Sequence, residues 1–268
     1  MGKLQDKTAL ITGASSGIGK EVARSFADEG ADVAVNYPDD SQAENARAVV
    51  AEVEKRGRRA VAIRADVSKT DENAAMVDQF IETFGHIDIL VNNAGIGRTA
   101  MVEDMSVEMW DEMIAVNLRS VFLATHKVLP LMYAQGHGKI INTASQLAYK
   151  GAPGLAHYTA SKAAIVSFTR SLSLEIGDRG VNVNCVAPGA TTTPILDGMD
   201  DGILEAIRLS IPRGRFGGRG NRADLCLPCV KRRRSLCRPM PEPKWRGYFS
   251  LEQIPSRWNH LRRRICLN

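Results

Sequence analysis

Tyr158 and Lys162 are the residues of this chain whose types and spacing best suit chemistry, together with Ser145, thirteen residues before the tyrosine. Residues four apart on a helix share a face, so the lysine ammonium can lie near the phenol and favour its phenolate form. Without help, a phenol loses its proton only at about pH 10. The serine hydroxyl can donate a hydrogen bond that fixes a substrate oxygen. Together these groups can exchange a proton with an oxygen atom, as hydride transfer to a carbonyl requires.

A second candidate site is the glycine-rich stretch of residues 13–19, which has the spacing G-x-x-x-G-x-G. A short apolar run at Thr8–Ile11 precedes it, and an amphipathic helix is predicted over Glu21–Glu29. Glycines let the backbone approach a pyrophosphate, and the amides and positive end of the following helix attract its charge. We therefore expect these residues to bind a dinucleotide: Gly13, Ser15, Ser16, Gly17, Ile18 and Gly19.

Short apolar runs and helical patterns alternate along the first 186 residues. The sequence predicts strands at Thr8–Ile11, Gly30–Asn36, Arg59–Ile63, Ile87–Val91, Lys139–Thr143 and Val181–Val186. It predicts the intervening helices at Glu21–Glu29, Gln42–Arg56, Asp71–Phe84, Val107–Met132 and Tyr158–Ile176. Such alternation requires right-handed crossovers between parallel strands, with helices on both faces. The predicted fold class is α/β, a doubly wound parallel sheet of the Rossmann type.

Further motifs fall in order at the expected carboxyl ends of the strands. The sequence Asn92-Asn93-Ala94-Gly95 follows the fourth strand, Ser145 follows the fifth, and Tyr158-x-x-x-Lys162 comes next. With the glycine spacing, these motifs resemble the short-chain dehydrogenase/reductase family over about Lys7 to Gly217. Three segments are most similar to the branch of the family that holds 3-oxoacyl-carrier-protein reductases and glucose 1-dehydrogenases. They are Asn142-Thr143-Ala144-Ser145, His157-Tyr158-Thr159-Ala160-Ser161-Lys162 and Val186-Ala187-Pro188-Gly189.

The resemblance implies an NAD(P)-dependent oxidoreductase acting on a carbonyl or a secondary alcohol. It implies Tyr158 as acid and base, Ser145 as the residue that orients the oxygen, and Lys162 as a support for the tyrosine and a ligand of the nicotinamide ribose. Asn117 joins them in a proton relay through water. A 3-oxoacyl thioester is the preferred substrate, and a sugar or small alcohol is the alternative. Loops near residues 97–102, 146–155 and 195–209 are expected to form the substrate walls.

The resemblance also implies cofactor contacts beyond the glycine turn. Asp66 would meet the adenine, although Asp66-Val67 also reads as a plain helix-capping turn. Gly95 would allow close approach, and the segment from Pro188 would cover the nicotinamide carboxamide, although Pro-Gly turns are common. The cofactor-binding residues predicted outside the glycine turn are Tyr37, Asp66, Val67, Asn93, Ala94, Gly95, Tyr158, Lys162, Pro188, Gly189 and Thr191.

The choice of cofactor depends on the end of the second strand, where an acid selects NAD and a basic group selects NADP. Tyr37 stands where many family members carry the acid, which disfavours strict use of NAD. Ser16 is neutral where many NADP users carry a basic residue, and Pro38-Asp39-Asp40 follows the strand. We predict NADP(H), with NAD as the alternative.

The chain's 268 residues are 24% charged and 44% hydrophobic, with a formal charge of +5. This charge is unevenly distributed. Residues 215–268 hold twelve Arg and two Lys against three acids, a net of +11, which leaves −6 for residues 1–214. With no run of eighteen apolar residues and no leader-like start, the sequence predicts a cytoplasmic protein with no membrane or nucleic-acid partner. His86, His126 and His137 lack metal-ligand spacing, so no metal is expected.

The basic tail interrupts the pattern, and we predict a catalytic domain over residues 1–217 and an atypical tail over 218–268. A basic arm for nucleic acid or membrane is one interpretation, and a zinc site at Cys226-x-x-Cys229 is another, although no matching second pair follows. A frameshift is the third and preferred hypothesis. Permitted codons for Leu227 to Arg238, shifted by one base, can read FLASSDDARYV, which resembles the family's approach to its last strand.

The frameshift hypothesis affects assembly more than chemistry. Members of the family that the chain resembles are homotetramers, and their last helix and strand contribute to the interface. The resemblance therefore leaves the catalytic residues in place but puts the assembly of this chain in doubt. An exposed sheet edge favours aggregation, so a cofactor-binding protein with little turnover is the alternative from another functional class.

Overall fold

The computed structural model describes residues 2–194, 201–211 and 215–217. The chain divides into two units, Met1–Ser235 and Leu236–Asn268, and every described residue belongs to the first. The predicted tail, residues 218–268, lies outside the described residues. Throughout the described part, each helix is too short or too polar to cross a membrane.

Six parallel strands form one sheet in the order β3-β2-β1-β4-β5-β6. The strands are β1 (Thr8–Ile11), β2 (Asp32–Tyr37), β3 (Ala60–Arg64), β4 (Ile89–Asn92), β5 (Gly138–Thr143) and β6 (Val181–Val186). The order reverses between β1 and β4, which defines the switch point of a doubly wound sheet. The predicted α/β fold class is confirmed.

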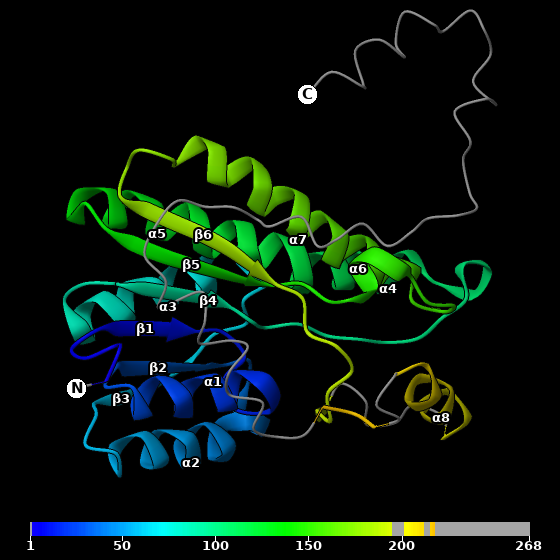
Figure 1. Cartoon of the computed structure of the whole chain (residues 1–268), viewed down its shortest axis with the longest axis horizontal. Helices are drawn as coiled ribbons and strands as arrows, with labels where there is room; N and C mark the ends of the chain where they lie inside the picture. Colours follow the sequence, from blue (N-terminus) through cyan, green and yellow to red (C-terminus); the bar gives the residue numbers. More distant parts are fainter. Residues whose placement is uncertain (1, 195–200, 212–214, 218–268) are drawn as a thin grey trace, which may run out of the picture. The chain divides into compact units, whose positions relative to one another are not determined.

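Helices cover both faces of this sheet (Figure 1). The longer ones are α1 (Gly17–Asp28), α2 (Ala43–Glu54), α3 (Thr70–Phe84), α4 (Val107–Ile114), α5 (Ser120–Gln135), α7 (Ala156–Glu175) and α8 (Asp201–Ser210). Shorter turns are η1 (Asp40–Gln42), η2 (Val102–Asp104), η3 (Ala115–Arg119) and α6 (Leu147–Lys150).

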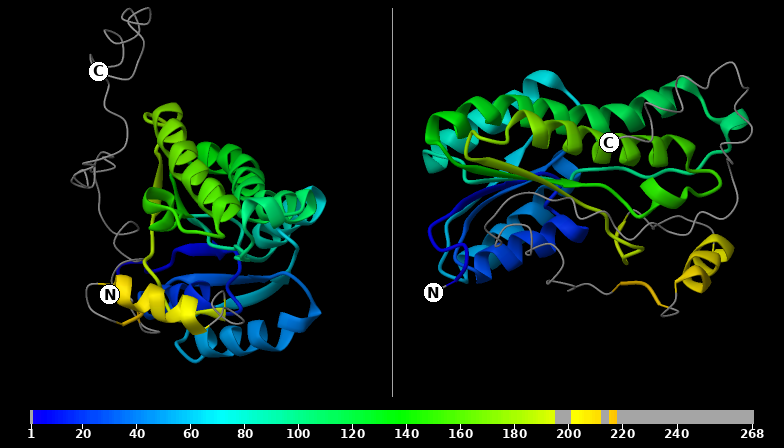
Figure 2. Two further views of the ribbon diagram at one scale, coloured as in Figure 1. Left: turned by 90° about the vertical axis from the view of Figure 1, so that its right-hand side faces the viewer. Right: turned by 45° about the horizontal axis from the view of Figure 1, so that its top comes forward.

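Two core clusters hold the layers together. Figure 2 shows α1 and α2 on one side of the sheet and α3, α5 and α7 on the other. Phe26 and Val49 pack α1 and α2 onto buried residues of β1 and β2. Phe80, Val128 and Leu172 bring α3, α5 and α7 into a second cluster on the opposite face. Apolar side chains alternate between these clusters along the strands, because successive residues of a strand point to opposite faces.

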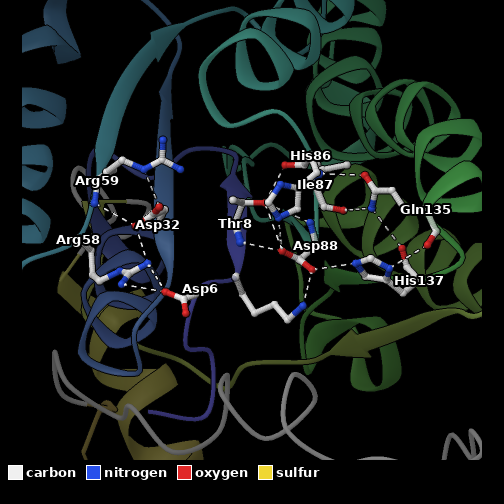
Figure 3. Close-up of polar contacts among 11 residues, drawn as sticks. Asp6, Thr8, Asp32, Arg58, Arg59, His86, Ile87, Asp88, Gln135 and His137 are labelled. Carbon is white, nitrogen blue, oxygen red and sulfur yellow. Dashed lines mark hydrogen bonds and ion pairs between the residues drawn. The ribbon is translucent and has the colours of Figure 1, made fainter. Parts of the chain in front are cut away.

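The amino ends of the central strands carry a compact ion-pair cluster around Asp88, only 4% of whose side chain is exposed (Figure 3). The Lys7 ammonium lies 2.8 Å from Asp88 Oδ1, and Thr8 N donates to Oδ2 at 3.0 Å. Imidazole nitrogens of His86 and His137 each lie 3.1 Å from the carboxylate. Burial opposes ionisation, yet the hydrogen bonds from Lys7 and Thr8 lower the pKa of Asp88.

Asp32 forms a similar cluster at the start of β2 (Figure 3). Arg58 Nη2 lies 2.8 Å from its Oδ1, and Arg59 Nε donates to its Oδ2 at 2.8 Å. The Arg59 backbone N–H also donates to Oδ1 at 3.0 Å. These bonds tie β2 to the start of the edge strand β3, so the amino edge of the sheet is held by paired charges.

Candidate active site

The turn from β1 to α1 leaves room for backbone only. Gly13 and Gly17 have positive φ angles of 61° and 56°, which L side chains rarely adopt. A Cβ on Gly19 would lie 2.4 Å from Gly13 O and 2.6 Å from Asn93 Nδ2, closer than real contacts allow. The glycines therefore form a tight backbone cradle, free of side chains, at the carboxyl edge of the sheet.

Thr12 and Asn93 hold this turn against the end of β4. Thr12 Oγ1 accepts hydrogen bonds from the backbone N–H groups of Asn93 and Ala94, at 2.9 and 3.0 Å. In return, Asn93 Nδ2 donates to Thr12 O at 2.9 Å and to Gly13 O at 3.1 Å. The bonds cross the switch point, where doubly wound sheets bind their ligands.

The start of α1 suits an anion. Ser16 is the N-cap residue, its side chain makes no capping hydrogen bond, and the first turn holds no acidic residue. The first amides of a helix lack intrahelical acceptors and lie at its positive end. Ser15 Oγ instead donates to Gln42 Oε1 at 3.3 Å, and Ile18 packs partly buried on the core below. The cradle and the uncapped helix start fit the pyrophosphate of a dinucleotide.

Asn36 links the glycine turn to the edge strand β3, and sequence reasoning missed it. Its Oδ1 accepts from Gly13 N at 3.1 Å, while Nδ2 donates to Ala65 O at 3.0 Å and to Ile63 O at 3.3 Å. Only 1% of the residue is exposed. A polar residue directly after the apolar run of residues 33–35 was the available signal, and Thr12 gave the same signal after β1.

Residues predicted to meet the adenosine lie beyond β2 and β3. Tyr37 ends β2 and is partly buried. The Asp66 carboxylate accepts from Ser68 N at 3.0 Å and from Ser68 Oγ at 2.7 Å, so it shapes the turn before α3, whose N-cap residue is Lys69. Val67 is buried beside it. The adenine contact of Asp66 stays a prediction.

A buried amide ladder fixes α7 against the sheet. Asn92 Nδ2 donates to Asn142 Oδ1 at 2.9 Å and to Thr125 Oγ1 at 3.2 Å. Asn142 Nδ2 then donates to Thr169 Oγ1 at 2.9 Å, and that hydroxyl donates to Ile165 O at 2.8 Å. The ladder joins β4 to β5, α5 and α7, and so fixes the helix that carries the tyrosine and the lysine.

Tyr158, Ser145 and Lys162 meet beyond the end of β5. Ser145 lies two residues past β5, is 7% exposed, and is near enough to the Tyr158 phenol to lower its pKa. Leu147 N donates to Ser145 Oγ at 3.2 Å and orients it. Lys162 Nζ lies 5.8 Å from the centre of the tyrosine ring, on the same face of α7. The three predicted groups are thus brought together.

Burial dominates the acid-base properties of this group. It raises the pKa of Tyr158, and the hydrogen bond with Ser145 opposes the increase only in part. We expected Lys162 to lower the pKa of the phenol, but the pKa of Tyr158 is raised instead. Burial lowers the pKa of Lys162 to about 8, with Cys185 acting in the opposite direction, and its ammonium donates to Thr143 O at 2.9 Å.

Asn117 lies in the π-helical turn η3 that interrupts the predicted 107–132 helix. Such turns occur often at functional sites. Its Oδ1 accepts from Ile96 N at 2.8 Å and its Nδ2 donates to Ile96 O at 3.0 Å, so the side chain clamps the segment after β4. A Cβ on Gly95 would lie 3.2 Å from Asn117 Oδ1 and 3.3 Å from Lys162 Nζ. Gly95 and Asn117 thus line the site beside the lysine.

The segment after β6 returns toward both halves of the site. Pro188 O accepts from Gln146 N at 3.0 Å, next to Ser145. A Cβ on Gly17 would lie 3.5 Å from Thr193 Cβ, so the segment also reaches the glycine turn. Its predicted cofactor-binding residues are Pro188, Gly189 and Thr191.

The expected substrate loops are partly helical. Residues 147–150 form α6 and residues 201–210 form α8, so the expectation of loops there is corrected. Apolar Leu204 and Ile207 recur at helical spacing in α8. Ala100 N donates to Gly154 O at 2.9 Å and joins the first two loops. Among the residues described, no group of His, Cys, Asp or Glu is arranged to hold a metal.

The fold and the site place the protein among the NAD(P)-dependent oxidoreductases that act on CH–OH groups. The family model described as short chain dehydrogenase matches residues 7–203. The chain belongs to the short-chain dehydrogenase family.

Similar proteins include both curated relatives and solved structures. The 3-oxoacyl-[acyl-carrier-protein] reductase FabG of Staphylococcus aureus is 42% identical over 211 residues, which cover 79% of this chain and 85% of the relative. A hydroxy(phenyl)methylsuccinyl-CoA dehydrogenase subunit, BbsD, of Thauera aromatica is 42% identical over 214 residues, covering 80% of this chain and 85% of the relative. A short chain dehydrogenase from Burkholderia cenocepacia, solved in complex with NADP, superposes with a TM-score of 0.77 at 39% identity, covering 85% and 91% of the two chains.

Proposed function

We propose that this protein uses NADPH to reduce the 3-oxo group of an acyl thioester. The observation that carries the proposal is the meeting of Ser145, Tyr158 and Lys162 at the same sheet edge as the glycine cradle. Two similar proteins, in Staphylococcus aureus and Thauera aromatica, are named for acyl-carrier-protein or CoA thioesters. An NADP-bound structure among the similar proteins supports the cofactor.

In the proposed reaction, the nicotinamide cofactor supplies the hydride when it is bound. Ser145 donates a hydrogen bond to the carbonyl oxygen and sets its position. Tyr158 donates its hydroxyl proton to that oxygen as negative charge develops there, leaving a phenolate. A phenol with a raised pKa resists ionisation alone, so the buried Lys162 ammonium is the nearby positive charge that compensates the phenolate. A proton relay through water, which Asn117 supports, would then return a proton to the Tyr158 phenolate.

The dinucleotide is assigned to the cradle and the adjacent strand ends. The turn of residues 13–19 would hold the pyrophosphate with the amides at the start of α1, because Gly13 N and Ala14 N already donate to Asn36. Asn93, Ala94 and Gly95 would lie beside the inner half of the cofactor. Lys162 and Tyr158 would bind the nicotinamide ribose, and residues 188–191 would cover the nicotinamide. Asp66 and Val67 would meet the adenine, with Tyr37 beside the adenosine ribose.

Initial rates test this proposal on the full chain. NADPH oxidation with an acetoacetyl thioester should exceed NAD reduction with glucose or a small secondary alcohol by at least about 10-fold in kcat/KM. A higher value for glucose would overturn the thioester and favour the sugar dehydrogenase. Tight NADPH binding without turnover on any carbonyl would instead favour a cofactor-binding protein.

We also propose that residues 1–217 form the catalytic domain and that residues 218–268 are translated from a shifted frame. The support is the change of net charge from −6 over residues 1–214 to +11 over residues 215–268. Sequencing the gene across codons 214–250 tests this directly. Codons for Leu227 to Cys237 that cannot yield the family-like string in another frame would refute it.

A further inference from the structure

Arg64 ends the edge strand β3 directly beside Tyr37, the last residue of β2. The two residues are register partners in the parallel pairing of these strands. Ser16, Tyr37 and Pro38, the positions that the sequence places near this point, are neutral. The sheet supplies a cation from a residue 27 positions further along the chain. Because the side chain of Arg64 is 57% exposed, its guanidinium is accessible.

The guanidinium is weakly bound to a partner that can be displaced. Arg64 Nη1 lies 3.5 Å from Asp40 Oδ1, and the Asp40 side chain is 81% exposed. Exposed pairs of this kind contribute only about 0–1 kcal/mol. Asp39, the other acid of the turn, accepts from Ser41 N at 2.9 Å and from Ser41 Oγ at 2.5 Å. Asp39 is therefore engaged in capping η1.

Two other charges of the described part that Arg64 influences, Lys69 and Glu72, are paired with each other. Lys69 Nζ lies 2.9 Å from Glu72 Oε1 and 4.0 Å from Asp66 Oδ2. Glu72 Oε2 also accepts from Asp66 N at 2.8 Å. Arg64 is therefore the basic group that the register places next to the end of β2, while Asp40 is the acid that competes for it.

We infer that Arg64 selects NADP(H) over NAD(H) by binding the 2′-phosphate of the adenosine ribose in place of Asp40. This inference rests on the proposed dinucleotide function. In doubly wound sheets the ribose 2′ position lies at the end of the second strand, where an arginine accommodates the phosphate. A guanidinium matches phosphate oxygens with two parallel N–H donors, and a phosphate carries more charge than the carboxylate it replaces.

Dissociation constants for NADPH and NADH, measured by calorimetry with the full chain, test the inference without relying on turnover. Arg64→Gln should weaken NADPH binding about 10-fold and change NADH binding less than 2-fold. Arg64→Lys should restore part of the NADPH affinity. Asp40→Asn should tighten NADPH binding about 2- to 3-fold, because it removes the competing carboxylate.

A matched control removes the same charge elsewhere. Arg170→Gln, at an exposed position of α7 two turns beyond Lys162, should leave both dissociation constants unchanged. Equal weakening of NADPH and NADH by Arg64→Gln would mean a structural role and would overturn the inference, as would unchanged NADPH binding. If the parent protein binds neither dinucleotide, the proposed function fails as well, so the two failures are distinguishable.

Discussion

The amino and carboxyl edges of the sheet, where the strands begin and end, place a buried charge in opposite electrostatic environments. At the amino edge, the nearly buried Asp88 carboxylate lies within 3.1 Å of Lys7, His86 and His137 (Figure 3). At the carboxyl edge, the nearly buried Lys162 ammonium donates to a neutral carbonyl, that of Thr143. Both groups have lowered pKa values. The shift favours the charged form of the aspartate but disfavours the charged form of the lysine.

This difference separates stability from function. Hydrogen bonds and opposite charges outweigh desolvation at Asp88, so the ionised carboxylate stabilises the fold. At Lys162 desolvation dominates, so the charged ammonium destabilises the fold at neutral pH. The same ammonium provides a positive charge beside Tyr158. We therefore expect substitutions at the carboxyl edge to affect turnover and substitutions at the amino edge to affect stability.

The largest effect is expected at Tyr158. Tyr158→Phe removes the proton donor but keeps the ring, and turnover should fall about 10²- to 10⁴-fold. Calorimetry should give NADPH dissociation constants within about 3-fold of each other for the two proteins, and the melting temperature should change little. Turnover within a few-fold of the parent would remove Tyr158 from the proposed mechanism.

Lys162→Met should affect activity and stability in opposite directions. Loss of the ammonium should reduce kcat/KM about 100-fold, since the phenolate of Tyr158 loses its compensating charge. The free energy of unfolding at pH 7 should rise by about 1–3 kcal/mol, because each unit of pKa depression represents about 1.4 kcal/mol of cost for the charged form. Activity assays and urea unfolding measure the two effects. A less stable Lys162→Met protein would contradict the assignment.

Asp88→Asn tests the amino edge. The amide cannot compensate Lys7, so we expect a loss of about 2 kcal/mol in the free energy of unfolding, below the range for fully buried pairs because Lys7 is half-exposed. The kcat of the folded protein should stay within 2-fold. Asp178→Asn, at an exposed position, is the matched control and should change stability by less than about 0.5 kcal/mol. A large loss of kcat in fully folded Asp88→Asn would mean that the amino edge also affects turnover, and would contradict the separation of the two edges.

The fold could be predicted from sequence because its strands are short apolar runs between helical patterns. Strands Thr8–Ile11 and Val181–Val186 have the predicted bounds, and the other strands differ by only one or two residues at either end. Register could not be predicted in the same way, because a parallel pairing joins residues far apart in the chain. For that reason the neighbourhood of Tyr37 and Arg64 was missed.

The catalytic residues could be predicted from type and spacing, but their energetics could not. Four-residue spacing places Lys162 near Tyr158, whereas the depth of both side chains depends on how α7 packs. Burial then reverses the expected direction of the pKa of Tyr158. The π-helical turn at Asn117 was missed for a related reason, since residues 107–132 read as long helical stretches and only backbone hydrogen bonds distinguish the turn.

The most direct comparison of the two edges is the dependence of stability on pH. Unfolded Asp88 ionises near its ordinary pKa of 3.8, and the folded residue does so at a lower pH. The stability that its charge contributes is thus present above the ordinary pKa and is lost as the pH falls through the lowered one. The stability gap between the parent protein and Asp88→Asn should therefore close in acid.

Lys162 should respond at the other end of the pH scale. The folded lysine releases its proton near pH 8, whereas the unfolded lysine holds it until about 10.5, so the unfolded chain binds more protons between these values. Stability relative to Lys162→Met must then rise with pH across that window. Urea unfolding of the parent protein and both variants from pH 4 to 10 measures both trends. If the difference in unfolding free energy between the parent protein and Lys162→Met stayed constant above pH 8, the cost of burying the ammonium would be compensated by other groups. The proposed contrast between the edges would then be wrong.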